Sequence, residues 1–90
     1  MKACGVYKLV APSGNIYVGS SVNLHNRFNQ HLRKLRLRKH ESETLQAVFD
    51  KYGSLKMEPL VICAPDNLLM YEQICIDALE PQYNATKTAG

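Results

Sequence analysis

Two β-rich runs at the start of the chain constrain its fold more than any other feature. Residues 4–11 (CGVYKLVA) and 15–21 (NIYVGSS) are rich in β-branched and aromatic side chains, and the Pro12-Ser13-Gly14 segment between them is typical of a tight turn. The pattern predicts an antiparallel β-hairpin.

The length of the hairpin loop decides where its two tyrosines point. With an odd loop, Ser13-Gly14-Asn15 and Pro12 opposite Ile16, Tyr7 and Tyr17 project from the same face. A two-residue turn would place them on opposite faces. The register therefore decides whether the two side chains can work together.

Two helices are predicted to follow the hairpin. The first covers residues 23–37, can be capped by Ser21 or Asn23, and has a buried stripe with helical spacing made of Leu24, Phe28, Leu32 and Leu35. The second covers residues 42–52 and ends at Gly53, with an apolar face made of Leu45, Val48, Phe49 and Tyr52.

A strand and a third helix complete the pattern. Residues 55–63 are expected to form an edge strand, because Pro59 cannot donate a ladder hydrogen bond. Asp66 is expected to cap a helix that runs to residue 79 and stops before Pro81. The order ββααβα predicts a small α/β (α+β) sandwich, with a three-stranded antiparallel sheet flanked by three helices.

Length and composition exclude several protein classes. Ninety residues allow one domain, residues 1–90. No apolar run approaches the ~20 residues of a membrane span, and no apolar signal segment precedes the hairpin, so we expect a cytoplasmic protein without a membrane partner. Cys4, Cys63 and Cys75 are far apart in the sequence and lack paired spacing, so we expect reduced core residues and no zinc site.

Charge is divided unevenly between the two halves of the chain. Residues 1–40 hold eight basic residues and no acidic one, which gives this half a net charge of +8. Residues 41–90 hold three basic and eight acidic residues, a net charge of −5, so that the whole chain has +3. A basic half suggests a polyanionic partner, and an acidic half can supply a functional carboxylate.

Glu72 stands in the middle of an otherwise apolar helical face. It lies four residues after Leu68 and four before Ile76, on the same side of the third helix. A buried carboxylate without a partner is costly, so it normally protonates or finds a cation. A salt bridge with Arg27 and a divalent metal ion such as Mg²⁺ or Mn²⁺ both remain open.

Four further residues are candidates for chemistry. Arg27 and His31 lie one turn apart at the edge of the first helix's buried stripe; arginine suits phosphate and histidine suits proton transfer. A solvated helix face would explain the pair equally well. Tyr7 and Tyr17 need no explanation as core-edge aromatics, but a nearby cation such as Arg27 could make a tyrosine a better base.

A basic run follows His31 directly. Residues 33–40 (RKLRLRKH) contain five of the eleven lysines and arginines. Such a run is often only a solvated face, but its place at the end of this helix favours contact with a phosphate backbone. The candidate DNA-binding residues are Arg33, Lys34, Arg36, Arg38, Lys39 and His40.

Together these residues resemble the GIY-YIG nuclease family. Gly5-Val6-Tyr7 and Tyr17-Val18-Gly19 are similar to its two signature tripeptides, each with Val in place of Ile. The further matches, in chain order, are Arg27, His31, Glu72 and Asn84, the last after the Pro-x-Tyr segment at residues 81–83. His40 resembles a further histidine found in some phage homing endonucleases. The resemblance covers residues 5–84.

The resemblance implies metal-dependent hydrolysis of double-stranded DNA. Arg27 would hold the scissile phosphate, and one Mg²⁺ or Mn²⁺ at Glu72 would polarise a phosphate oxygen and help the departing 3′ oxygen. Tyr7 would activate the water, with His31 as the proton acceptor beyond it. The resemblance also implies that Tyr17 shares this network and that Asn84 braces the site. Which tyrosine is the general base stays open.

Within the family, the chain is most similar to the catalytic domain of a phage- or intron-encoded homing endonuclease. Few long polar side chains remain that could read base edges, so sequence selection is expected from a C-terminal DNA-binding segment or a partner chain. Three alternatives stay open: an inactive nucleic-acid-binding module, a restriction or repair nuclease of the family, and a structural domain in which Glu72 pairs with Arg27. The target sequence and oligomeric state also stay open.

Overall fold

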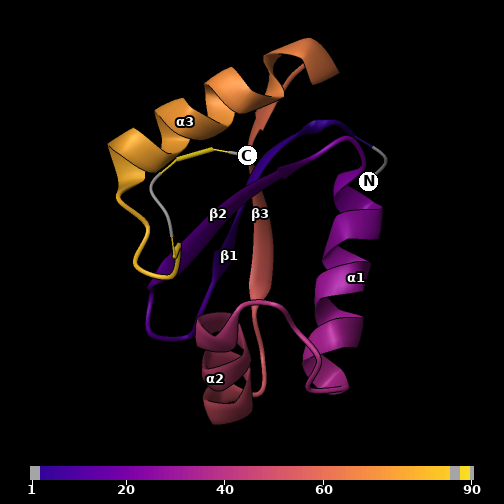
Figure 1. Cartoon of the computed structure of the whole chain (residues 1–90), viewed down its shortest axis with the longest axis vertical. Helices are drawn as coiled ribbons and strands as arrows, with labels where there is room; N and C mark the ends of the chain where they lie inside the picture. Colours follow the sequence, from indigo (N-terminus) through magenta and orange to yellow (C-terminus); the bar gives the residue numbers. More distant parts are fainter. Residues whose placement is uncertain (1–2, 86–87, 90) are drawn as a thin grey trace.

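Three strands form one antiparallel sheet in the computed structural model, which describes residues 3–85, 88 and 89. Strand β1 (Gly5–Val10) is central and pairs with β2 (Ile16–Ser21) on one side and β3 (Lys56–Ile62) on the other (Figure 1). Pro59 therefore lies in an edge strand, as predicted, next to a register shift in the β1–β3 pair.

The hairpin closes in a different register from the expected one. Val10, not Pro12, pairs with Ile16, and the Ala11 N–H donates to the Asn15 carbonyl at 3.0 Å. The expected opposition of Pro12 and Ile16 is therefore wrong. The loop still has an odd number of residues, so residues of the same parity share a face.

The two tyrosines lie on the same face, the outcome that an odd loop requires. Tyr7 pairs with Gly19 and Tyr17 with Leu9, and the two aromatic rings lie 6.5 Å apart between centroids. Both side chains project from the hairpin towards the first helix.

Helices cover both faces of the sheet. Helices α1 (Leu24–Arg36) and α2 (Glu43–Tyr52) pack on one face, while α3 (Leu68–Leu79) packs on the other after the 3₁₀ turn η1 (Pro65–Asn67) (Figure 1). The predicted order ββααβα is confirmed. No helix in the described part of the chain is long and apolar enough to cross a membrane.

The helix ends follow local capping chemistry. The Asn23 side chain accepts from the Asn26 N–H at the start of α1, and Ser42 accepts from the Leu45 N–H at the start of α2. The prediction that Asp66 caps α3 is wrong, because Pro65 starts the η1 turn and so places Asp66 inside it.

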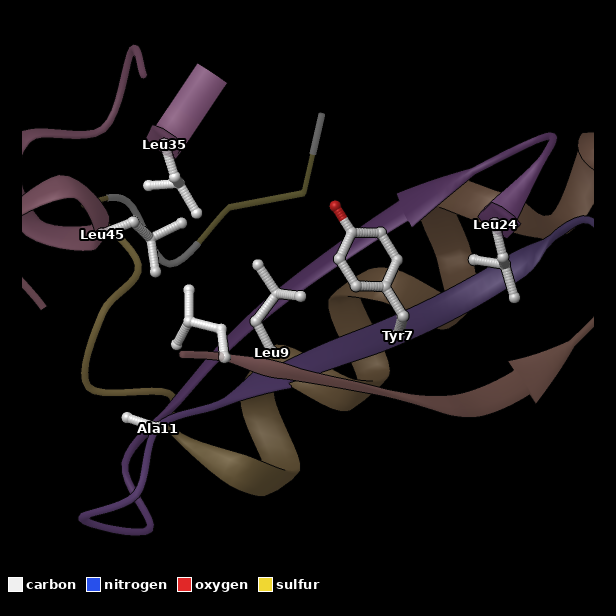
Figure 2. Packing of buried hydrophobic residues seen from close by; sticks show 7 residues of the cluster. Tyr7, Leu9, Ala11, Leu24, Leu35 and Leu45 are labelled. Atoms are coloured by element: carbon white, nitrogen blue, oxygen red, sulfur yellow. The ribbon is translucent and has the colours of Figure 1, made fainter. Parts of the chain in front are cut away.

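Alternation along β1 divides the core into two clusters. Odd-numbered residues, including Tyr7 and Leu9, pack with Leu24, Leu35 and Leu45 of α1 and α2 (Figure 2). Even-numbered Val6 packs with β2 and α3, in a cluster that also contains Val18, Cys75 and Ile76. Leu79, at the C-terminal end of α3, is exposed.

Candidate active site

The Tyr7 ring is fixed in a closed slot of the core. Its side chain is 0% exposed, and its hydroxyl points away from β1 (Figure 2). Gly19 lies opposite on β2, where a β-carbon would stand 2.6 Å from the Tyr7 hydroxyl oxygen and 2.7 Å from Cζ. The glycine of the second tripeptide is therefore required by the tyrosine of the first.

Gly5, in the first tripeptide, allows close approach of a strand instead. A β-carbon at Gly5 would stand 2.2 Å from the Val61 carbonyl oxygen of β3. Because the obstacle is backbone, no side-chain movement could relieve it. Gly5 therefore fixes how β1 and β3 meet.

A chain of hydrogen bonds leads from the Tyr7 hydroxyl to the start of α2. Tyr7 Oη lies 2.7 Å from His31 Nε2, and His31 Nδ1 lies 2.8 Å from His40 Nε2. The Ser42 backbone N–H then donates to His40 Nδ1 at 3.0 Å. The two imidazoles are stacked, with ring centroids 5.0 Å apart.

The Ser42 N–H sets the direction of every bond in this chain. A backbone N–H can only donate, so His40 Nδ1 must carry a lone pair and the His40 proton must sit on Nε2. His40 then donates to His31 Nδ1, and the His31 proton sits on Nε2, where it donates to Tyr7. Glu41 Oε2, 4.0 Å from His40 Nδ1, is too distant to alter this assignment.

In the resting protein His31 therefore donates to Tyr7. The resemblance to the family concerns the reaction, in which His31 would accept a proton. The part each residue plays in a reaction stays a prediction.

Both histidines are held in their neutral form. Burial, then the charge of Arg27 and the neighbouring His40, lower the pKa of His31 to about 3. Burial is also the main cause that lowers the pKa of His40. His31 is only 3% exposed, although its position suggested the edge of the α1 stripe.

Burial keeps both tyrosine hydroxyls protonated at neutral pH. It is the largest cause that raises the pKa of Tyr7, followed by Tyr17; a hydrogen bond from Arg27 and its charge oppose the rise. Burial also raises the pKa of Tyr17, again against the charge of Arg27. The Glu72 carboxylate adds to the rise at both residues, so it lies within electrostatic reach of both.

Glu72 is buried as predicted, on the other face of the sheet from Tyr7. It is 9% exposed, and its Oε1 accepts a 2.5 Å hydrogen bond from the Ser20 hydroxyl of β2. Among the described residues no ion pair joins Glu72 to Arg27, whose Nη1 donates instead to Gln30 at 3.3 Å. The salt-bridge interpretation of Glu72 is therefore wrong.

A cleft at the free edge of β2 links the two faces. It has a volume of about 460 Å³, and its walls include Tyr17, Glu72 and Asn84. Tyr7 is not part of its lining and lies behind Tyr17. The cleft thus brings together one tyrosine, the carboxylate and the tail.

The donor set fits a hard cation with few protein ligands. Glu72 has a neutral hydroxyl as its hydrogen-bond partner, so its negative charge is not compensated there. No group of three or more His, Cys, Asp or Glu side chains in the described ranges could hold a metal. Mg²⁺ is often held by one or two carboxylates, with water and substrate oxygens completing its shell.

The tail braces β2 along its free edge. Asn84 Oδ1 accepts from the Val18 N–H at 2.8 Å, and its Nδ2 donates to the Val18 carbonyl at 2.9 Å. Two residues earlier on β2, the Ile16 N–H donates to the Gln82 side chain and the Tyr83 N–H donates to the Ile16 carbonyl, both at 3.0 Å. Residues 82–84 thus hold the edge of β2 through two side chains and one backbone bond.

The basic run lies at the C-terminal end of α1 and just beyond it. Lys34 is paired with Glu41, and Arg38 Nε lies 3.7 Å from Asp50. Three members have no acidic partner in the part of the chain that the structure describes: Arg33, Arg36 and Lys39. Arg33, Lys34 and Lys39 line a surface cavity of about 480 Å³.

His40 departs from its expected place in the DNA-binding set. Its side chain is 5% exposed and lies within the hydrogen-bond chain to Tyr7. It therefore belongs with the tyrosine and the first histidine, not with the exposed basic residues.

Three participants went unnoticed in the sequence. Ser20 binds Glu72, the Ser42 N–H orients His40, and Gln46 holds the His40 segment by accepting from the His40 N–H at 3.3 Å and donating to the Leu35 carbonyl at 3.0 Å. Ser20 did leave a signal, because it is a polar residue two positions after buried Val18, on the face that packs against α3. The other two contacts arise only from tertiary structure.

Comparison with known proteins identifies the family to which this fold belongs. A family model described as the GIY-YIG catalytic domain matches residues 3–84. A mutant form of the catalytic domain of intron endonuclease I-TevI superposes with a TM-score of 0.87 at 25% identity, covering 98% of this chain and 99% of that one. The structure of the catalytic domain of homing endonuclease I-TevI superposes with a TM-score of 0.82 at 24% identity, covering 92% and 98%.

No curated protein sequence matches the chain. The family match nevertheless covers nearly the whole chain, and the hairpin, the α1 residues, the α3 carboxylate and the tail asparagine fall within it. The chain therefore belongs to the GIY-YIG family and is a nuclease catalytic domain.

Proposed function

We propose that this nuclease hydrolyses phosphodiester bonds in double-stranded DNA with one divalent cation, Mg²⁺ or Mn²⁺, held by Glu72. The observation that carries this proposal is the buried Glu72 carboxylate, which has a neutral hydroxyl as its partner and lies in the wall of the β2-edge cleft. The cation would supply Lewis-acid polarisation of a phosphate oxygen and charge compensation for the departing oxygen.

Arg27 holds the scissile phosphate. Its guanidinium is charged at any pH the protein meets and offers a fork of donors that matches phosphate oxygens. Its charge acts on Tyr7, Tyr17 and His31 alike, which places it among all three. A phosphate bound there lies beside the tyrosines.

Tyr7 is the general base of the proposal. His31 Nε2 donates to its oxygen, and Arg27 acts to lower its pKa; a donor and a nearby cation of this kind stabilise a phenolate. His31 thus acts by donating to the oxygen that takes up negative charge. Tyr7 must lose its own proton before it can accept one from water.

Tyr17 is the second candidate for the base. It lines the cleft, whereas Tyr7 does not, so a water in the cleft reaches Tyr17 first. Conversion of each tyrosine to phenylalanine distinguishes the two. The base variant loses cleavage across the pH range, whereas a variant that only orients water keeps a reduced rate with the same pH dependence.

Sequence selection comes from outside these residues. Arg33, Arg36 and Lys39 are exposed and suit phosphates, which position DNA without reading its sequence. A DNA-binding segment in a longer chain, or a partner chain, would supply base contacts, as in a homing endonuclease.

Cleavage of supercoiled plasmid tests the proposed function. Nicked or linear product is expected with Mg²⁺ or Mn²⁺, and none with EDTA. Cleavage in EDTA would disprove the metal requirement. DNA binding without cleavage in any divalent ion would favour the inactive-module alternative.

A further inference from the structure

Two cysteines that are distant in the sequence lie side by side at one end of the sheet. Cys4 precedes β1 and Cys63 follows β3, and the pairing of Gly5 with Ile62 continues to these two residues. The Cys63 N–H donates to the Cys4 carbonyl at 3.0 Å. Residues directly opposite in an antiparallel pair project from the same face, so the two side chains are neighbours.

The two side chains also influence each other. Burial raises the pKa of Cys4, and the neighbouring Cys63 side chain adds to the rise. Both residues are half-buried and free, so a small molecule can reach them. Cys75, the third cysteine, is buried in the α3 cluster.

The backbone spacing matches that of a disulfide. Opposed residues that exchange a backbone hydrogen bond have Cα atoms ~5.5 Å apart, and disulfides span Cα separations of ~4.4–6.8 Å. This general spacing allows a disulfide between the two residues. The contact of these two thiols serves no part of the proposed cleavage reaction.

We propose that Cys4 and Cys63 form a redox site, which a low-molecular-weight disulfide such as oxidised glutathione converts to a reversible intramolecular disulfide. One thiolate attacks the glutathione disulfide, forms a mixed disulfide and releases one glutathione thiolate. The second cysteine thiolate then attacks the protein sulfur of that mixed disulfide and releases the second glutathione. The protein loses two electrons and two protons, and the glutathione disulfide takes up both pairs.

The bond would tie the start of β1 to the point where the chain leaves β3 for η1 and α3. It would close a loop of about sixty residues, which lowers the entropy of the unfolded chain more than a short loop would. Glu72 lies on the helix that follows this junction. Oxidation would therefore stabilise the sheet end from which the chain leads to the helix that carries Glu72.

Peptide mapping of the full chain tests the proposal. After treatment with oxidised glutathione, free thiols are alkylated under denaturing conditions and the protein is digested without reductant. We expect one Cys4–Cys63 linked peptide, alkylated Cys75, and a melting temperature higher by about 5 °C or more that dithiothreitol reverses. Cys4 and Cys63 both alkylated, bonds to Cys75, or bonds only between molecules would overturn the proposal.

Two variants complete the experiment. Cys63→Ser leaves Cys4 without a partner, so Cys4 should retain a glutathionyl group as a stable mixed disulfide. Cys75→Ser should behave as the unsubstituted protein, because the buried thiol takes no part. Melting of Cys63→Ser unchanged by oxidation supports the proposal, and the same rise as in the unsubstituted protein contradicts it.

Discussion

Gly19 and Tyr7 face each other across the hairpin so closely that a β-carbon on Gly19 would lie 2.6 Å from the Tyr7 hydroxyl oxygen. The two signature tripeptides are therefore one packing unit. The second keeps a glycine because the first places an aromatic ring against it.

Gly19→Ala should displace Tyr7 and cost ~1–3 kcal/mol of stability, as overpacking of a close-packed core usually does. The displaced hydroxyl should also lose its contact with His31. The rate of cleavage should therefore fall even under conditions in which the variant is fully folded. Urea denaturation and plasmid cleavage measure the two effects. In a double-mutant cycle Tyr7→Phe should relieve part of the Gly19→Ala cost, because it removes the atom 2.6 Å away. Strictly additive costs would show that the two residues are not in conflict.

Glu72→Gln should abolish metal-dependent cleavage while keeping the fold. The amide oxygen can still accept the Ser20 hydrogen bond but carries no charge, so a loss on the order of 10³-fold or more is expected. Ser20→Ala is the matched control: it keeps the carboxylate and should lose much less. Cleavage by Glu72→Gln at the unsubstituted rate in Mg²⁺ would rule out Glu72 as the metal ligand.

Substitution of Arg27 should mainly lower the cleavage rate, whereas substitution of the exposed basic residues should mainly lower the affinity for DNA. Arg27→Ala should lose about 10²–10³-fold in rate, as expected for the main stabiliser of developing phosphate charge. Neutralising Arg33, Arg36 and Lys39 should mainly weaken DNA binding and flatten its salt dependence by about one unit of slope per lost phosphate contact. A pure binding defect in Arg27→Ala would contradict its catalytic assignment.

The tautomers of the two histidines can be observed directly. Nitrogen-15 NMR should find the proton on Nε2 in both His31 and His40, because the Ser42 N–H occupies His40 Nδ1. Ser42→Pro removes that N–H at a φ of −86°, close to the value that proline adopts, and should let the tautomers mix. Ser42→Ala keeps the N–H and should leave them unchanged. A proton on His40 Nδ1 in the unsubstituted protein would refute the proposed direction.

His31 should make stability depend on pH in acid. Its folded pKa of about 3 lies below the unfolded value of ~6.5, so between these values the unfolded chain binds more protons. The contribution is fully present above pH ~6.5 and is lost as the pH falls towards 3, by up to ~1.4 kcal/mol per pH unit. Urea denaturation at several pH values should show a shallower acid decline for His31→Gln. Equal slopes for both proteins would mean that His31 is not buried in its neutral form.

The element boundaries were accessible from the sequence because local chemistry sets them. Asn23, Ser42 and Gly53 begin and end helices through contacts within a few residues, and the predicted bounds hold to within about two residues. Asp66 fails as a cap because Pro65 forms a turn one residue earlier. Local signals compete there, and the sequence does not show which prevails.

The sequence predicts a site residue only where its polarity differs from that of the neighbours on the same face. Glu72 is visible as a carboxylate on an apolar face, and its burial is confirmed. His31 is not visible in this way, since helical spacing gives its angle around α1 but does not show that the loop before α2 brings His40 against it. The contact of Cys4 with Cys63 was missed because it depends on β3 pairing with β1 across most of the chain.

The contact of Asn84 with β2 determines when the cleft can form during synthesis of the chain. Val18 and Asn84 are 66 positions apart, so the cleft wall closes only after nearly all of the described chain has left the ribosome. A partly synthesised chain can pair β1 with β2 and bury Tyr7, yet it lacks both Glu72 and the segment that clamps the strand edge. The cleft is thus the last part of this domain to form, because its walls take residues from near both ends of the described chain.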